Sequence, residues 1–363
     1  MTIRHCEERS DVAIFKPTRK IIIKYNKTMK RIVLAITAVA ALAACTKSEV
    51  AYEAPAEIGF APFTGNITKA SGMSGELDDE QELGIYAFWN KTVDLGTQSS
   101  VAVPQDGYAA YNDNYLVNAL FASKSGSWGG SPTGYPWPVN GALVFAGYTT
   151  PGDAVLAADK VSYDLAADKM TFTGYTNNEF DLCWFGRTAN SYNYRASGTA
   201  VPVTLSHALS WISIAVYGEG STIGWTINSL EWKVPTAGTA TCVGTSATWD
   251  NLTTPTTATN ILASNHTIAA GTTTDGKTTG TKITDNLVIP STPVELTVNY
   301  TFMVNGVAKS DSKTVSLKLD EANSTKWASG VHYTYTLAFK ANEILVAPSY
   351  GEWATSDQTV TVE

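Results

Sequence analysis

Strict alternation of apolar and polar side chains is the feature that most limits what this chain can fold into. The stretch VELTVNYTFMV, residues 294–304, places every second residue from Val294 to Phe302 on one face and mostly polar residues on the other. Because successive side chains of a strand point to opposite faces, this pattern predicts a half-buried β-strand. The Asn305-Gly306 pair that follows is typical of a two-residue hairpin turn.

Similar short segments recur along the chain, and no long stretch after residue 45 has a helical period. We expect strands at residues 57–63, 83–89, 142–148, 161–165, 169–175, 181–185, 201–205, 211–218, 314–319 and 331–339. Plentiful Thr, Tyr and Trp suit pleated surfaces, while Gly, Asn and Pro mark the turns between them. The sequence therefore predicts an all-β protein of antiparallel sheets, packed face to face as β-sandwiches.

A chain of 363 residues is long enough for about two domains at ~150 residues each. A polar loop at 189–196 and the SGTA segment at 197–200 precede a fresh strand, so we expect domains at 57–200 and 201–363. The Thr-rich stretch 251–285 is expected to be a long insertion loop or a mobile surface flap.

The amino-terminal apolar run, Ile32–Ala44, is too short to span a bilayer, which needs ~20 apolar residues. It has the length of the apolar region of a signal peptide, and Lys30 and Arg31 supply the preceding positive charge. Small residues lead into Cys45, and the segment resembles the bacterial lipobox. The alternative is a buried apolar helix that ends in a cysteine.

This interpretation assigns residues 29–44 to a lipoprotein signal peptide, Cys45 to lipidation and residues 45–56 to a polar tether. Residues 1–28 carry mixed charges without a period, and Met29 makes a natural start. We therefore expect residues 1–28 to lie outside the true protein, the alternative being a genuine amino-terminal extension.

Charge and motifs exclude several classes of function. The net charge of −8 argues against nucleic acid, which attracts basic surfaces. The sequence contains no H-E-x-x-H, no G-x-S-x-G, no Walker A and no cysteine pair with zinc spacing. We expect no enzyme, no cofactor and no metal site, although a pair of glycosidase carboxylates would meet only in three dimensions. His207 adjoins an apolar strand and is expected to be a packed or edge histidine rather than a metal ligand.

Two further pairs of residues leave alternatives open. Cys183 and Cys242 are expected to be small buried hydrophobes, the alternative being a single bridge between domains. Trp128 and Trp137 lie near Gly and Pro, as in loops that stack on carbohydrate, although core packing is the default for such rings.

An ordered set of segments carries a family resemblance. EIGFAPF, NITKASG, LGIYAFW, YPWPVNGALVFAGYTTP, DLCWFGRT and VTLSHALSWISIAV are followed by WASGVHYTYTLAFKANEILVAPSYGEW. Together with the lipobox, this set resembles the fimbrillins, the pilins of Bacteroidetes bacteria, over most of residues 42–353. The resemblance implies two tandem transthyretin-like β-sandwich domains of Greek-key type. It also implies export as a lipoprotein to the outer membrane and a structural role in a surface fimbria.

The resemblance further implies assembly by strand exchange. A trypsin-like protease removes the first strand, and a strand from the next subunit fills the groove that is left, which is β-augmentation. In this sequence Ile58 and Phe60 would plug the groove, and cleavage would fall between Lys69 and Ala70. The alternative for Lys69 is an ordinary solvated loop lysine.

The donor strand is expected after residue 339. Two short alternating segments qualify, and they contain Ile344 and Val346, and Val360 and Val362. The alternative is that both segments simply close the second sandwich. The expected partners are other fimbrial subunits, the protease and host or bacterial surface glycans or proteins.

A different function class remains open beside the pilin. The chain could be a monomeric outer-membrane lipoprotein that binds glycans, with Trp128 and Trp137 as its stacking platforms.

Overall fold

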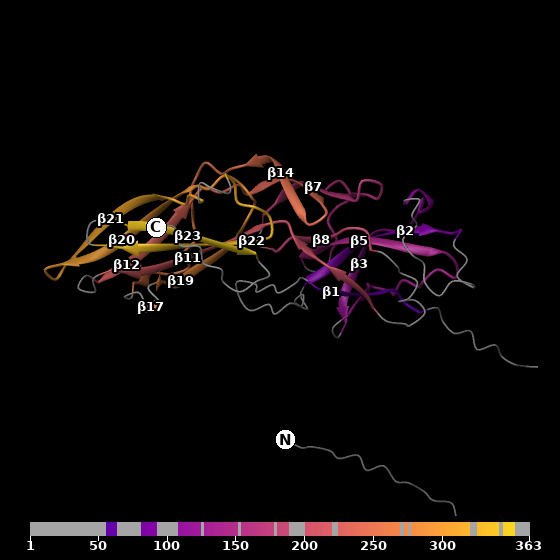
Figure 1. Ribbon diagram of the computed structural model, residues 1–363, viewed down its shortest axis with the longest axis horizontal. Coiled ribbons are helices and arrows are strands. Elements are labelled where there is room, and N and C mark those ends of the chain that lie inside the picture. The colour runs from indigo at the N-terminus through magenta and orange to yellow at the C-terminus, as the bar shows by residue number, and fades with distance from the viewer. Residues whose placement is uncertain are drawn as a thin grey trace, which may run out of the picture. The chain divides into compact units, whose positions relative to one another are not determined.

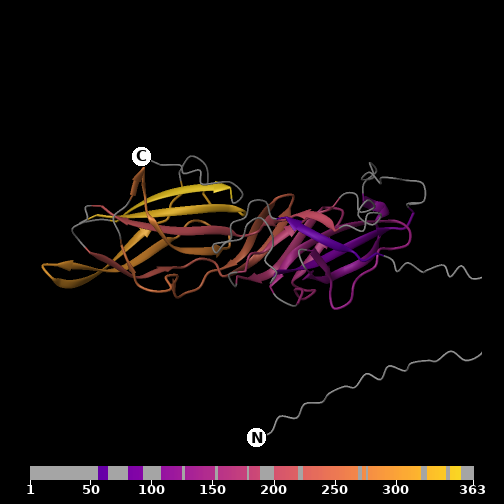
Figure 2. The same cartoon turned by 90° about the horizontal axis from the view of Figure 1, so that it is seen from below.

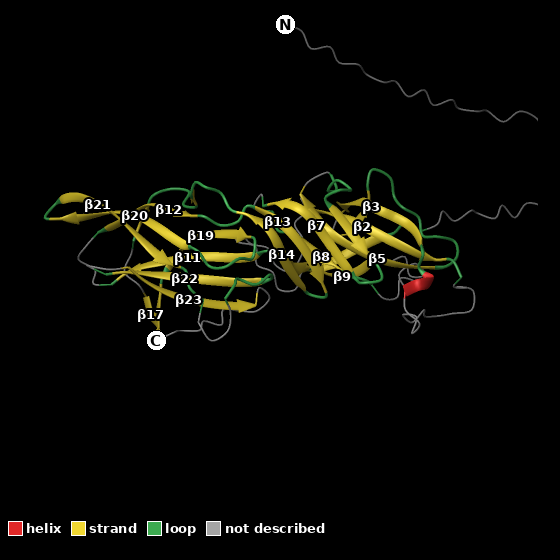
Figure 3. Ribbon diagram, turned by 90° about the horizontal axis from the view of Figure 1, so that it is seen from above, coloured by secondary structure: helices red, strands yellow, loops and turns green. Residues whose placement is uncertain are grey.

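The computed structural model describes residues 56–63, 81–92, 108–124, 127–151, 154–177, 180–188, 200–219, 224–268, 272–274, 277–319, 325–340 and 344–352. In these ranges the regular secondary structure is all strand, apart from a single-turn 3₁₀ helix at Tyr108–Ala110 (Figure 3). The prediction of an all-β fold is confirmed. No helix in the described part of the chain is long and apolar enough to cross a membrane.

The first sheet holds the amino-terminal strands (Figure 1). Its order is β10 (Ser206–His207), β8 (Cys183–Phe185), β5 (Ala142–Pro151), β2 (Gln81–Asn90), β3 (Asp113–Lys124), β4 (Ser127–Gly130), β1 (Gly59–Phe63) and β9 (Val201–Thr204). The two end strands, β9 and β10, are separated in sequence only by Leu205. One continuous segment thus pairs with both ends of the sheet, so the sheet bends back on itself around an inner core.

A second sheet covers the outer face of the first. Its order is β14 (Ser246–Thr253), β13 (Ala237–Val243), β7 (Lys169–Thr176) and β6 (Val161–Asp164). Strand β2 shows why both faces are buried: Ile85 faces the inner core, while Tyr86 faces an outer core shared with the second sheet. The alternation predicted for LGIYAFW is therefore correct, and both faces of the strand carry apolar residues.

The expected division at residue 200 cuts through these sheets. β13 lies beyond residue 200 in sequence but pairs antiparallel with β7, with Cys242 opposite Met170. β9 also follows residue 200 and pairs with β1. Local alternation shows that a segment is a strand but not which strand it joins, so no sequence pattern indicates that the hairpin at 237–253 returns to the first half.

The carboxy-terminal strands form two sheets around a third core. One has the order β19 (Thr281–Val288), β11 (Ser210–Gly218), β22 (Val331–Phe339) and β23 (Ile344–Glu352). The other has the order β15 (Thr259–Asn260), β12 (Trp225–Trp232), β20 (Glu295–Val304) and β21 (Val307–Ser316), and β16 (His266–Thr267) also pairs with β12. β22 and β23 run side by side (yellow in Figure 2). Apolar residues from both sheets share one core, as in a β-sandwich.

Three details differ from the sequence-based expectation. The pairs β1–β9 and β11–β22 are parallel rather than antiparallel. The Thr-rich stretch is not one loop, because β19 pairs along β11 and the short strands β17 (Thr272–Thr274) and β18 (Lys277–Thr279) pair with each other.

The third difference concerns the hairpin at Asn305-Gly306. The turn is present, with positive φ at both residues, as its sequence predicts. Its return strand begins at Val307 rather than residue 314. Residues 307–314 are exposed on both faces, so they carry no apolar alternation for a pattern to detect.

Candidate functional site

The slot between β4 and β9, which β1 occupies, is the candidate functional site. β1 pairs antiparallel with β4, where Phe60 lies opposite Trp128, and parallel with β9, where Phe60 lies beside Val201. Just before β1, the backbone N–H of Ile58 donates to the carbonyl of Tyr135 at 2.7 Å. The segment is therefore held by backbone hydrogen bonds along both of its edges.

The side chains of this segment fill the inner core. Ile58 and Phe60 are 1% and 0% exposed. The Phe60 ring meets Phe121 and Phe145 edge-on, each with 5.1 Å between ring centroids, and Phe185 lies at 6.2 Å. Burying a phenylalanine fully stabilises a fold by ~1.5–3 kcal/mol, and such ring contacts add ~0.5–1.5 kcal/mol each. Phe60 thus acts as a plug in an aromatic pocket, while its role as part of a removable strand stays a prediction.

β9 depends on β1 for its place in the sheet. Within the described residues, β1 is the strand that β9 pairs with, over the four positions from Val201 to Thr204. The inward side chains of this segment, Val201, Val203 and Leu205, belong to the same core as Phe60. Without β1, the inward side chains of β9 would still face the core, but β9 would lose its backbone pairing with a neighbouring described strand.

Trp128 and Trp137, the predicted stacking platforms, are both buried at 4% exposure. The Trp128 indole donates its Nε1–H to the carbonyl of Gln81 at 2.7 Å, and Trp137 meets Phe145 edge-on. Because a sugar stacks on an exposed ring face, neither ring is available to one. The alternative of core packing is what the structure has at both positions.

Ile344 and Val346, one of the two donor candidates, lie in β23. This strand pairs with β22 over nine positions, from Phe339 opposite Ile344 to Val331 opposite Glu352. Both side chains are partly buried against the carboxy-terminal core. In this structure the segment therefore closes its own sandwich.

The other predicted site residues fall outside the described part of the chain. They are Cys45, Lys69, Ala70, Val360 and Val362.

A buried polar cluster joins β8 to β10, and sequence reasoning found only part of it. Cys183 lies directly opposite His207, and Asp181 precedes Cys183 by two residues. The two described cysteines, Cys183 and Cys242, are free thiols, so they form no bridge. Burial, the nearby Asp181 charge and a hydrogen bond to it raise the pKa of the Cys183 thiol well above its usual range. His207 is both packed and at an edge, as expected, while the D-x-C spacing that places Asp181 beside it is the signal that could have found the cluster.

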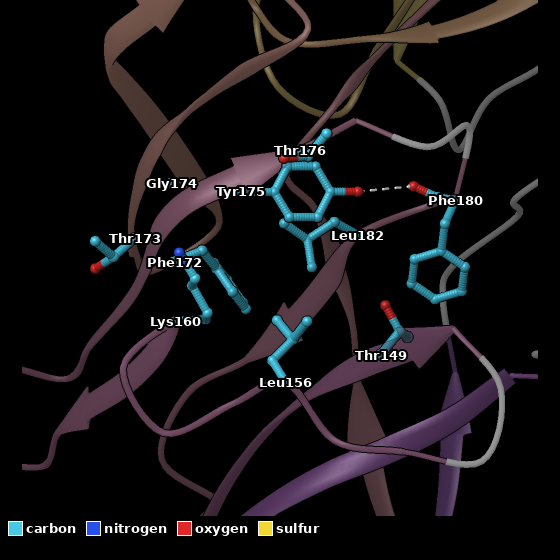
Figure 4. Close-up of a pocket in the computed structure, with 10 residues that line it drawn as sticks. All are labelled: Thr149, Leu156, Lys160, Phe172, Thr173, Gly174, Tyr175, Thr176, Phe180 and Leu182. Atoms are coloured by element: carbon cyan, nitrogen blue, oxygen red, sulfur yellow. Dashed lines mark hydrogen bonds between the residues drawn. The ribbon is translucent and has the colours of Figure 1, made fainter.

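A pocket is lined in part by residues of the outer core (Figure 4). It encloses about 230 Å³ and is walled mainly by apolar side chains, among them Leu156, Phe172 and Leu182. The Tyr175 hydroxyl at its rim donates to the carbonyl of Phe180 at 3.3 Å. The lining lacks the converging acid and base groups that catalysis needs.

Comparison with solved structures finds several chains that resemble this one. A fimbrial protein from Bacteroides vulgatus is 17% identical, with a TM-score of 0.53, over 82% of this chain and 99% of that one. A candidate cell adhesion protein from Bacteroides uniformis is 17% identical with a TM-score of 0.45, over 82% and 99% of the two chains. A fimbrial assembly protein from Parabacteroides distasonis is 12% identical with a TM-score of 0.39, over 81% and 94%. No curated protein sequence matches the chain.

The family comparison is more direct. A model of the fimbrillin-like family matches residues 68–353, which is most of the chain and contains every described strand except β1. The chain therefore belongs to the fimbrillin-like family.

Proposed function

We propose that this chain is a non-catalytic structural subunit of a cell-surface fimbria and that its subunits join by strand exchange. The observation that carries the proposal is the slot, where a five-residue strand lies between two neighbours and plugs the core with a fully buried Phe60. The family supports it, as does the similar structure from Bacteroides vulgatus, which is a fimbrial protein. Strand exchange needs a strand whose departure leaves a lined, strand-shaped gap, and β1 meets that need.

Proteolysis is the step that releases β1 in this proposal. β1 ends at Phe63 and β2 begins at Gln81, so Lys69 lies in the connection between them. A trypsin-like cut between Lys69 and Ala70 would leave β1 held by non-covalent contacts alone. The same cut would separate the subunit from its upstream segment, including a lipid carried by Cys45 that anchors the precursor to the outer membrane.

The donor is the segment with Val360 and Val362 rather than the segment with Ile344 and Val346. β23 would have to give up its ladder with β22 and its contacts with the carboxy-terminal core to serve as a donor. Residues 358–363, QTVTVE, alternate in the same way, and their use as a donor breaks none of those contacts. In the slot, two valines spaced two residues apart can take the inward positions of Ile58 and Phe60.

The proposed domains follow the sheets. The first sandwich comprises residues 56–208 together with the hairpin at 237–253, and the second comprises the remaining strands from residue 210 onward. Both belong to the tandem transthyretin-like type that the family resemblance implies.

Limited trypsin treatment of the full chain tests the proposal. We expect a cut whose new amino terminus is Ala70, followed by oligomers that resist detergent and form filaments visible by electron microscopy. The matched control, Lys69→Gln, should remain monomeric under the same treatment. A wild-type chain that is cut after Lys69 and stays monomeric at high concentration would contradict strand exchange.

The rival function, a monomeric glycan-binding lipoprotein, loses the two residues that motivated it, because Trp128 and Trp137 are buried. No other observation in the described structure favours it.

A further inference from the structure

Three potential metal ligands meet where the first sheet closes. Cys183 in β8 and His207 in β10 are directly opposite each other in an antiparallel pair. Asp181 lies two residues before Cys183, and side chains at that spacing share a face of an extended chain. The cluster therefore gathers a thiol, an imidazole and a carboxylate on one side of a two-stranded ribbon.

The polar atoms of the three side chains lie close together. The His207 Nδ1 atom is 3.0 Å and 2.9 Å from the two carboxylate oxygens of Asp181, and 3.3 Å from the Cys183 Sγ atom. One ligand atom from each residue lies within 4.8 Å of the other two. The residues are 4%, 1% and 6% exposed for Asp181, Cys183 and His207.

We propose that Asp181, Cys183 and His207 bind a zinc ion. A thiolate together with an imidazole and a carboxylate is a donor set that suits Zn²⁺, whereas Ca²⁺ and Mg²⁺ prefer oxygen alone. The charges also balance, because a dication with one thiolate and one carboxylate is neutral. Neutrality matters here, since an uncompensated charge at a site this deeply buried would be costly.

Binding replaces hydrogen bonds with metal bonds. Zinc takes an electron pair from Sγ and one from Nδ1, and the protons on those two atoms leave, to water or, for the ring, to Nε2. Zinc lies ~2.0–2.3 Å from such ligands, which in a tetrahedron holds them ~3.3–3.6 Å apart. The observed separations of 2.9–3.3 Å to Nδ1 thus need to widen by only a few tenths of an ångström. These residues supply three of the four ligands that tetrahedral zinc takes, and a water molecule would supply the fourth.

The same geometry argues against a catalytic Cys-His-Asp triad. In a triad one ring nitrogen of the histidine hydrogen-bonds to the nucleophile, and the other hydrogen-bonds to the carboxylate that orients the ring. Here the thiol and the carboxylate both approach Nδ1. Convergence on one atom suits a shared cation, and the experiment must exclude the alternative, a metal-free hydrogen-bonded cluster.

The site's position gives the metal a structural task. β10 continues directly from β9. A metal ion bound by Asp181, Cys183 and His207 would therefore hold in place the end of the segment that closes the first sheet. A buried site of this kind fills as the protein folds, because its ligands are inaccessible afterwards.

Refolding with a spectroscopic probe tests the proposal. The full chain, with Cys6→Ser and Cys45→Ser to remove the other thiols outside the described fold, is unfolded with chelator and refolded with Co²⁺ alone. We expect one cobalt per chain, with a thiolate charge-transfer band and the intense visible bands of tetrahedral Co²⁺, all displaced by Zn²⁺. Cys183→Ser should abolish the charge-transfer band, whereas Cys242→Ser, the matched buried cysteine, should keep it.

The measurement on the chain that keeps Cys183 and Cys242 decides the matter even if the Cys183→Ser and Cys242→Ser variants do not fold. A chain that refolds to its native circular dichroism spectrum without retaining cobalt or zinc would overturn the proposal. So would metal that a chelator strips from the native protein at once, or a charge-transfer band that survives Cys183→Ser.

Discussion

The first and last described strands, β1 and β23, differ in length and in their position within a sheet. β1 is five residues long, lies between two neighbours and buries Phe60 completely. β23 is nine residues long, lies at the end of its sheet and pairs with β22 alone among the described strands. A short strand between two others leaves behind a gap with hydrogen-bonding groups on both sides, whereas a long edge strand leaves only an edge. The comparison suggests that exchange concerns the inserted strand and not the edge strand.

Hydrogen exchange should show the largest difference between the two strands. After cleavage at Lys69 and dilution to keep subunits apart, the amides of β9 should lose most of their protection, because β9 loses the strand it pairs with. The amides of β22 that face β23 should keep theirs. Mass spectrometry of exchanged peptides measures both, with uncut protein as the control. Unchanged protection of residues 201–204 in cut monomers would contradict the predicted difference between β1 and β23.

Truncating the Phe60 plug should cost more stability than truncating a side chain of β23. Phe60→Ala removes a fully buried ring and should lower the free energy of unfolding of the first sandwich by ~3–5 kcal/mol. Val346→Ala in β23, where the side chain is only partly buried, should cost less than ~2 kcal/mol. Urea denaturation followed by tryptophan fluorescence compares them. Equal costs would mean that β1 is no more anchored by its side chains than the edge strand is.

Alkaline pH should weaken the sheet that holds β1 through Tyr86. Burial raises the pKa of this hydroxyl from 10.0 to about 12, so its contribution is fully present below pH 10 and is lost as pH rises through 12. Between pH 10 and 12 the unfolding free energy should therefore fall less steeply in Tyr86→Phe than in the wild type. The difference between the two slopes should be at most ~1.4 kcal/mol per pH unit. Titration of stability by urea at several pH values measures the slope, with the two proteins compared first at neutral pH. Identical slopes would show that Tyr86 is not protected in the folded state.

A change at the far hairpin should have the smallest effect. Gly306 has a φ of 78°, which L side chains rarely adopt, and a Cβ there would meet no atom within 4 Å. Gly306→Ala should therefore cost the second sandwich only ~1 kcal/mol, through backbone strain alone. It should leave the release of β1 unchanged, and filament yield after trypsin measures that. A loss of filaments would mean that the second sandwich controls the slot.

Sequence patterns predicted the strands better than their partners. The segment 331–339 matches β22 to the residue, and 83–89 with its two faces lies within β2, because apolar alternation there reports burial directly. Residues 307–314 were not predicted as strand because their side chains are exposed on both faces and so show no apolar alternation. The return of 237–253 to the first half escaped it because pairing between distant strands leaves no local trace.

The candidate site was partly predictable for the same reason. Ile58 and Phe60 stood out as inward residues of a short strand, and both are buried. The sequence could not show that β1 lies inside a sheet rather than at its edge, nor that Trp128 and Trp137 turn inward. The D-x-C spacing of Asp181 and Cys183 is visible in the sequence, but only the fold shows that Asp181 contacts His207.

A reversible lock on β1 tests the central claim most directly. Gly59 and Gly129 are opposite each other in β1 and β4, so Gly59→Cys with Gly129→Cys places two thiols across the ladder. Oxidised and then cut at Lys69, this chain should stay monomeric because the disulfide keeps β1 in the slot, and adding reductant should start polymerisation. If the oxidised, cut chain forms filaments as readily as the wild type, then β1 does not have to leave, and strand exchange at this slot is wrong.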